Sequence, residues 1–243
     1  KGVITMDKSK LVKFINKYYL SGNVNSVAIN SDGNGLSTRF VSGDKSLLGE
    51  VKLKNYSITE ADFGVYQTDA LLKMLSVLDN DVSVDLVKAE EKAISLDAKD
   101  SGAKVRYMLS DLSVINTPPQ LKQIPEFELL LNVDKTFVSK FISGKGALPD
   151  TESFTIVSGD NPEVVIGYSS IATNRVAVPV ENQTDNTIDN ISFNANLFKD
   201  VLEANKECEA AVLEVSSEGL ARITFNVGDY ESTYYLVAVQ NVN

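Results

Sequence analysis

The sequence contains no histidine and only one cysteine, Cys208. Without histidine there is no Ser-His-Asp or Cys-His nucleophile, no histidine-ligated metal and no imidazole general base. A single cysteine excludes an internal disulfide framework and fits a reducing compartment. Because a thiol nucleophile needs a base, we expect Cys208 to be structural. Magnesium chemistry on carboxylates remains an open possibility.

Long apolar runs are also missing, since no stretch approaches the roughly 18 residues that suggest a membrane span. The hydrophobic fraction of 43% and the charged fraction of 23% are ordinary for a globular protein. The first residues, KGVITMDKSK, lack the basic-then-apolar pattern of a secretory signal. We therefore expect a cytoplasmic protein that does not enter a membrane.

Motifs of catalysis and metal binding are weak or incomplete. The stretches SGDKS (42–46) and SGKG (143–146) lack the frame of a phosphate-binding loop. Calcium-loop spacing occurs at Asn30, Asp32 and Asn34, but Val41 stands where the acidic twelfth ligand belongs. The sequence thus predicts a protein that is not an enzyme, with no catalytic residue, metal or cofactor.

Hydrophobic periodicity predicts the elements of the first half. A period near 3.6 residues predicts helices at 7–17 and 68–78, with Thr68 as the cap of the second. Alternation of apolar and polar residues predicts strands at 24–31, 35–42, 47–55, 63–67, 82–87, 92–98 and 103–111. The turn Asp32-Gly33-Asn34-Gly35 predicts a hairpin between the first two strands, because Asp-Gly and Asn-Gly pairs tolerate positive φ.

The pattern breaks in the segment 112–125. Pro118, Pro119 and Pro125 cannot donate to a central ladder, so this segment is expected to be extended. Beyond it, helices are predicted at 134–145 and 195–206, and strands at 127–133, 153–158, 163–168, 174–180, 190–194, 209–216, 220–226 and 232–239. We therefore predict an N-terminal domain at 1–116, a connector at 117–125 and a C-terminal domain at 126–243.

The two halves repeat each other in sequence as well as in element order. DKSKLVKFI (7–15) returns as DKTFVSKFI (134–142), and LLK (71–73) matches LFK (197–199) more weakly. A long-period repeat indicates architecture. Here it predicts an α+β fold with two copies of one domain, each an antiparallel sheet scaffold with two helices on one face.

Lysine is concentrated on the helices. The four predicted helices hold ten of the 23 basic residues but only five of the 33 acidic ones, within a formal net charge of −10. On the first helix Lys10, Lys13 and Lys17 fall opposite the apolar face. Solvated helix faces often carry lysine without any function. The concentration of lysine on the helices nevertheless favours a basic surface that binds a polyanion without recognising the sequence of its bases.

Two long phrases and the repeated basic helices carry a family resemblance. FGVYQTDALLKMLSVLDNDVSVDL (63–86) and ITFNVGDYESTYYLVAVQ (223–240) resemble the corresponding stretches of DNA sliding clamps, most of all those of T-even-type bacteriophages. The resemblance implies the DNA clamp fold. It further implies a non-enzymatic homotrimeric ring whose helices surround double-stranded DNA and tether the replicative DNA polymerase for processivity.

The resemblance also implies a clamp loader, a set of DNA-contacting lysines and strands that close the ring. A clamp loader ATPase would place the ring on DNA, in the cytoplasm of a host bacterial cell if the chain is encoded by a phage. The helix lysines would contact phosphates without sequence preference; they are Lys10, Lys13, Lys17, Lys73, Lys140, Lys145, Lys199 and Lys206. The ring would close through edge strands, for which 103–111 and 174–180 are the candidates.

Partner peptides of clamps dock beside the connector and the C-terminus. By position, the pocket here would be bordered by Val114, Ile115, Leu121, Ile124, Val239 and Val242. Apolar residues among prolines can equally be plain linker packing, and both interpretations stay open. The remaining alternative is a non-enzymatic, β-rich structural or adhesive module unrelated to DNA, towards which the glycosylation sequons at Asn55, Asn182 and Asn190 point.

Overall fold

The computed structural model describes residues 5–169 and 171–240 and divides the chain into two compact units. Unit 1 contains the chain up to Gly43, Gly49–Pro118 and Gly228–Glu231. Unit 2 contains Asp44–Leu48, Pro119–Val227 and the chain from Ser232 onward. A short segment of each half of the sequence thus belongs to the compact unit formed by the other half.

Unit 1 consists of two antiparallel sheets and two helices. Its helices are α1 (Lys8–Tyr19) and α2 (Thr68–Leu75), and short 3-10 turns occur at Leu20–Gly22 and Leu112–Val114. The strands are β1 (Met6–Asp7), β2 (Val27–Ser31), β3 (Gly35–Val41), β4 (Leu47–Lys54), β5 (Ala61–Val65), β6 (Asp81–Ala89), β7 (Lys92–Lys99) and β8 (Lys104–Met108). One sheet has the order β1-β6-β7-β8 and the other contains β5-β2-β3-β4.

Unit 2 has the same order of elements. Its helices are α3 (Lys135–Ala147) and α4 (Ala195–Ala204). The strands are β9 (Leu129–Asp134), β10 (Ser153–Val157), β11 (Glu163–Ile166), β12 (Val176–Pro179), β13 (Ile191–Asn194), β14 (Ala210–Ser216), β15 (Leu220–Val227) and β16 (Tyr230–Val237). One sheet is ordered β12-β11-β10-β13, and the other contains β9-β14-β15-β16.

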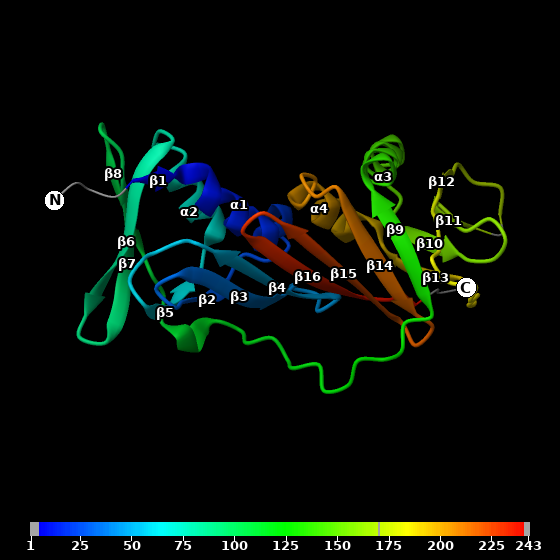
Figure 1. Ribbon diagram of the computed structural model, residues 1–243, viewed down its shortest axis with the longest axis horizontal. Coiled ribbons are helices and arrows are strands. Elements are labelled where there is room, and N and C mark those ends of the chain that lie inside the picture. The colour runs from blue at the N-terminus through cyan, green and yellow to red at the C-terminus, as the bar shows by residue number, and fades with distance from the viewer. Residues whose placement is uncertain (1–4, 170, 241–243) are drawn as a thin grey trace. The chain divides into compact units, whose positions relative to one another are not determined.

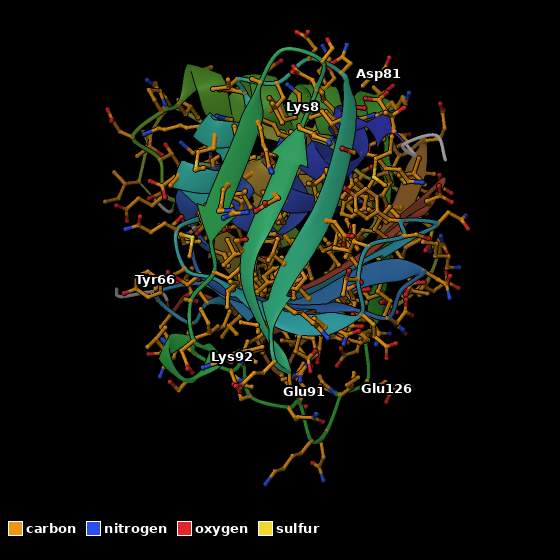
Figure 2. All side chains as sticks on the ribbon, turned by 90° about the vertical axis from the view of Figure 1, so that its left-hand side faces the viewer. Lys8, Tyr66, Asp81, Glu91, Lys92 and Glu126 are labelled. Atoms are coloured by element: carbon orange, nitrogen blue, oxygen red, sulfur yellow. The ribbon has the colours of Figure 1, made fainter. Side chains whose placement is uncertain are left out.

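The repeat in sequence becomes a repeat in topology, which confirms the predicted α+β fold class. In each unit the first strand pairs with the sixth, and the fifth strand pairs with the second. Within each unit, the two helices contact each other and lie on one side of that unit's sheets (Figure 1). Figure 2 views the β6–β8 sheet of unit 1, with Lys8 and Asp81 at one end and Glu91 and Lys92 at the other.

Equivalent capping residues begin the repeated helices. The carboxylate of Asp7 accepts a hydrogen bond from the Ser9 amide at 2.9 Å, and Asp134 accepts one from the Phe137 amide at 2.8 Å. Such caps satisfy amides that have no partner within the helix. The sequence DK at the start of each repeat therefore sets where α1 and α3 begin.

Each core is built from the apolar faces of its helices. In unit 1 Phe14 and Tyr18 of α1 are fully buried, and the Tyr18 hydroxyl lies 2.8 Å from Oγ1 of Thr68 on α2. This burial raises the pKa of Tyr18. In unit 2 the core is rich in phenylalanine, with five rings, Phe137, Phe141, Phe154, Phe193 and Phe198, linked by contacts between neighbouring pairs.

Several element ends differ from the predictions. Thr68 does not cap α2, because it is the first helical residue and its buried side chain bonds to Tyr18. The same helix stops at Leu75 rather than 78, and α3 continues to Ala147 rather than 145.

No helix among the described residues is long and apolar enough to cross a membrane.

Candidate nucleic-acid interface and partner groove

The lysines predicted to contact DNA differ widely in exposure. Four of them are exposed: Lys13 on α1, Lys73 on α2, Lys140 on α3 and Lys206 just after α4. Lys10 and Lys199 are half-buried. Every helix, or the residues directly after it, therefore presents an exposed or partly exposed lysine, as the partition of charge predicts.

Lys17 is a correction to the predicted exposed stripe of α1. Its side chain is fully buried, and its ammonium lies over the Tyr230 ring, 5.0 Å from the centroid. A ring face attracts a cation, so the charge has a favourable environment there. The helical period places Lys17 with Lys10 and Lys13, but it contains no information about a tyrosine more than 200 residues away in the chain.

Lys145 is the second correction. It is 3% exposed and lies in the last turn of α3. Its ammonium donates to the carbonyl oxygens of Leu148 at 3.2 Å and Pro149 at 2.8 Å. Lysine at a helix C-terminus stabilises carbonyls that have no partner within the helix. Lys145 therefore ends a helix and has no free ammonium for a phosphate.

Acidic residues accompany some of the remaining lysines. Lys10 forms an ion pair with Asp229 at 3.0 Å, and Lys199 faces Glu203 at 4.0 Å, one turn along α4. Lys13, Lys73, Lys140 and Lys206 are the exposed members of the set. These acids reduce the local positive charge, although both lysines remain partly exposed.

A groove of about 400 Å³ lies on unit 1 at the start of the predicted connector. One wall comes from the segment after β8, with Leu112, Ile115 and Pro118. The floor comes from β2, β3, β4 and β5, where polar side chains dominate: Asn30, Arg39, Glu50 and Asp62. Apolar residues on one side and charged residues on the other suit an amphipathic peptide.

Gly64 explains how the segment after β8 reaches this place. The Ser110 amide donates to the Gly64 carbonyl at 3.0 Å, and the two residues form an isolated bridge. A Cβ atom on Gly64 would lie only 2.5 Å from Oγ of Ser110. The close approach therefore needs glycine, and it holds residues 110–118 against the sheet of unit 1.

The residues predicted to border a partner pocket are distributed over both units. In unit 1 Ile115 is 8% exposed and lines the groove, whereas Val114 is 55% exposed and is not among its lining residues. In unit 2 Leu121 and Ile124 are exposed, and the half-buried Val239 donates its amide to the Ser192 carbonyl. Val242 lies outside the described residues.

Unit 2 contains a larger pocket of about 800 Å³ between β9 and β12. Beyond the end of β12 the chain reaches β9, where the Asn132 amide donates to the Glu181 carbonyl at 2.8 Å. Towards β12 the pocket is lined by Val176 and Val178, and α3 contributes Phe137 and Lys140. Helix α3 can come close to β12 because Gly144 has no Cβ, which would lie 2.8 Å from Cγ1 of Val176.

Both strands proposed for ring closure are at sheet edges. Strand β8 pairs only with β7, and β12 pairs only with β11 within the four-stranded sheets of the described residues. Met108 of β8 is 64% exposed. Unpaired strand edges are templates for pairing with another chain. The observed strands, 104–108 and 176–179, are shorter than the predicted ranges 103–111 and 174–180.

Candidate metal ligands do not converge in the described part of the chain, where no group of three or more histidine, cysteine, aspartate or glutamate residues could hold a metal ion. In the calcium-like turn the Asp32 carboxylate accepts from the amides of Asn34 and Gly35, both at 2.8 Å. Cys208 is buried, and its thiol donates to the Ala210 carbonyl. These groups therefore stabilise local structure.

The comparisons with known proteins identify the fold. No protein-family model matches this chain, and no curated protein matches it. A crystal structure of the Proliferating Cellular Nuclear Antigen (PCNA) from Entamoeba histolytica is similar, with a TM-score of 0.75 and 12% identity over 97% of each chain. The structure of A. fulgidus PCNA with the C-terminal region of FEN-1 bound has a TM-score of 0.76 and 15% identity over 99% of each chain. This chain therefore has the DNA clamp fold along nearly its whole length.

Proposed function

We propose that this protein is a DNA sliding clamp, which binds duplex DNA without sequence specificity and tethers the enzymes that act on it. The observation that carries this proposal is the clamp fold over 97–99% of the chain, with both units included. It is supported by exposed lysine on or directly after each of the four helices. One of the similar structures, A. fulgidus PCNA, also has the C-terminal region of FEN-1 bound to it.

More specifically, we propose that three copies of the chain form a homotrimeric ring like the clamps of T-even-type phages. Residues 1–116 and 126–243 are its two clamp domains, and 117–125 is the connector. The ring tethers a replicative DNA polymerase, is placed on DNA by a clamp loader ATPase, and works in the cytoplasm of a host bacterial cell. Topology retains the ring on DNA, so the protein needs no catalytic step and no cofactor of its own.

Weak phosphate contacts are the role we assign to the accessible helix lysines. The main contributors are the exposed Lys13, Lys73, Lys140 and Lys206. The half-buried Lys10 and Lys199 each face an acidic residue and contribute less. Lysine presents a point charge on a flexible stem and releases counterions from DNA without fixing register. Lys17 and Lys145 are left out because both are buried.

Ring closure joins β8 of one copy to β12 of the next. Head-to-tail contacts of this kind generate rings when the rotation closes. The exposed Met108 on β8 is an apolar side chain suited to the pocket lined by Val176 and Val178 of the neighbouring copy. For partner peptides we propose the groove of unit 1 beside the connector, which Ile115 lines and which the exposed Val114 adjoins in sequence. Leu121, Ile124 and Val239 stay predictions, on unit 2.

Retention on DNA of different topology tests the proposal. Protein loaded onto nicked circular duplex should stay bound at a salt concentration that removes it from linear duplex of the same length. Cutting the circle with a restriction enzyme should then release it. Equal retention on both forms would mean ordinary surface binding, and absence from both would favour a β-rich interaction module unrelated to DNA.

A further inference from the structure

The turn between β15 and β16 contains an acidic residue that holds one of the proposed DNA-binding lysines. The turn residues Gly228–Glu231 belong to unit 1, as does Lys10. The Lys10 ammonium lies 3.0 Å from the Asp229 carboxylate and donates to the Asn55 carbonyl at 2.8 Å. The Asn55 side chain in turn donates to Asp229 at 2.9 Å. Lys10, Asn55 and Asp229 therefore form a closed triad.

The backbone holds this carboxylate in place. The Lys54 amide donates to the Asp229 carbonyl at 2.9 Å, and the Tyr230 hydroxyl donates to the Lys10 carbonyl at 2.8 Å. Asn55 adopts a positive φ of 56°, a conformation that asparagine tolerates better than most residues. Asp229 is thus held beside Lys10 by the surrounding hydrogen bonds, unlike a counterion that exchanges with solvent.

The pair is ionised and still within reach of solvent. The Lys10 side chain is 27% exposed and the Asp229 side chain 37%. Hydrogen bonds from Lys10 and Asn55 hold the pKa of Asp229 below its ordinary value, so it is a carboxylate at neutral pH. A DNA phosphate that approaches Lys10 must replace an anion that is already bound. Replacing one anion by another therefore contributes much less binding free energy than the neutralisation of a phosphate by an unpaired ammonium.

We infer that Asp229 acts as an internal competitor of the DNA phosphates and keeps Lys10 from contributing a full contact. The inference rests on the proposed clamp function and specifies how its contact with DNA is regulated. Fewer simultaneous phosphate contacts make the potential along the duplex shallower, which favours sliding. Of the proposed DNA-binding lysines on α1, this leaves Lys13 to make a full phosphate contact, because Lys17 is covered by Tyr230.

Asp229→Asn tests the inference, because it removes the charge and keeps the shape of the side chain. Affinity for a short linear duplex of mixed sequence is measured by fluorescence anisotropy over a range of salt concentrations. Each phosphate contact contributes about 0.9 to the slope of log K against log salt. The variant should therefore steepen the slope by about 0.9 and bind about eight-fold tighter near 0.1 M salt.

Three further variants separate the inference from a general charge effect. Asp160→Asn removes the same charge from an exposed turn of unit 2 and should change affinity less than about two-fold. Lys10→Gln in the Asp229→Asn background should cancel the gain. Lys10→Gln alone should leave the salt slope almost unchanged, whereas Lys13→Gln should lower it by about 0.9. The last two variants keep the test valid if Asp229→Asn does not fold.

The outcomes distinguish this inference from the proposed function. If the wild type is retained on circular DNA but Asp229→Asn behaves like Asp160→Asn, the inference is wrong and the clamp function stands. A gain that persists without Lys10 also overturns the inference, since the released charge would then act elsewhere. If the wild type neither binds the duplex nor stays on circular DNA, the proposed function itself fails.

Discussion

Replacing Phe141 by alanine should unfold unit 2 at a lower temperature than unit 1. Phe141 of α3 is fully buried, and its ring centroid lies 5.3 Å from that of Phe154 on β10 and 5.0 Å from that of Phe198 on α4. Phe154 and Phe198 are themselves 4.9 Å apart. The three rings therefore join both helices of unit 2 to its β12-β11-β10-β13 sheet.

The expected cost is at the upper end of the range for such a change. Truncating a buried phenylalanine to alanine costs about 3–5 kcal/mol. Each ring pair contributes about 0.5–1.5 kcal/mol beyond the area it buries, and the pairs with Phe137, Phe154 and Phe198 are all lost here. We therefore expect a loss of about 4–5 kcal/mol, a large part of the roughly 5–15 kcal/mol that stabilises a typical domain.

Hydrogen exchange with mass spectrometry resolves the two units and is the suitable assay. Amides of unit 2 should lose protection in Phe141→Ala, while those of α1 and α2 keep it. Phe127→Ala is the matched control in unit 2, because Phe127 is half-buried and its ring lies 4.7 Å from the Arg222 guanidinium carbon. We expect the control to cost about 1 kcal/mol. Equal losses for the two variants would refute the packing argument.

Three further predictions concern charge, pH and assembly. The double variant Lys13→Gln/Lys140→Gln should lower the salt slope of DNA binding by about 1.8, twice the contribution of one phosphate. Hydrogen bonds from Arg106 and Ser95 lower the pKa of Asp97 in the folded state, so its stabilising contribution is present above the unfolded pKa near 3.9 and is lost as the pH falls further. Asp97→Asn should therefore flatten the decline of unit 1 stability below about pH 4 in acid denaturation. Met108→Asp on β8 should abolish the trimer in light scattering, because it places a charge on the proposed interface.

Each of these predictions has a control or a contrary result. A slope unchanged by loss of Lys13 and Lys140 would remove both from the DNA-binding set. An acid-denaturation profile of Asp97→Asn that overlays the wild type would mean that the pair with Arg106 is energetically neutral. Ile171→Asp, which alters an exposed apolar residue outside the edge strands, should remain trimeric. If it dissociates as Met108→Asp does, the interface has been placed wrongly.

Much of the fold could be predicted because its determinants are local. The repeat predicts helices beginning at Asp7 and Asp134, and in the structure each of these residues caps the helix that begins at the next residue. Most strands alternate in polarity because one face is buried, so the pattern predicts them. Strand β1 (Met6–Asp7) was not predicted, because two residues are too few to show a period. The helix ends were less predictable, since the side chain of Thr68 is buried against Tyr18 and does not form a cap.

The site was predictable only where no distant residue intervenes. Lys13 and Lys140 are exposed as their helical positions predict. Lys17 has an equivalent position on α1, but the Tyr230 ring covers it. Lys10 is paired with Asp229, the residue directly before Tyr230. The groove of unit 1 is another long-range feature, because it forms only when the chain after β8 returns to β5, where the Ser110 amide bonds to the Gly64 carbonyl.

The solution mass of the protein tests the central claim most directly. Light scattering over a dilution series should give a species near three times 26.4 kDa that dissociates only at low concentration. Such a trimer is what a ring made from two-domain chains requires. A species of 26.4 kDa at every concentration would contradict the account, because a monomer has no closed ring with which to hold DNA.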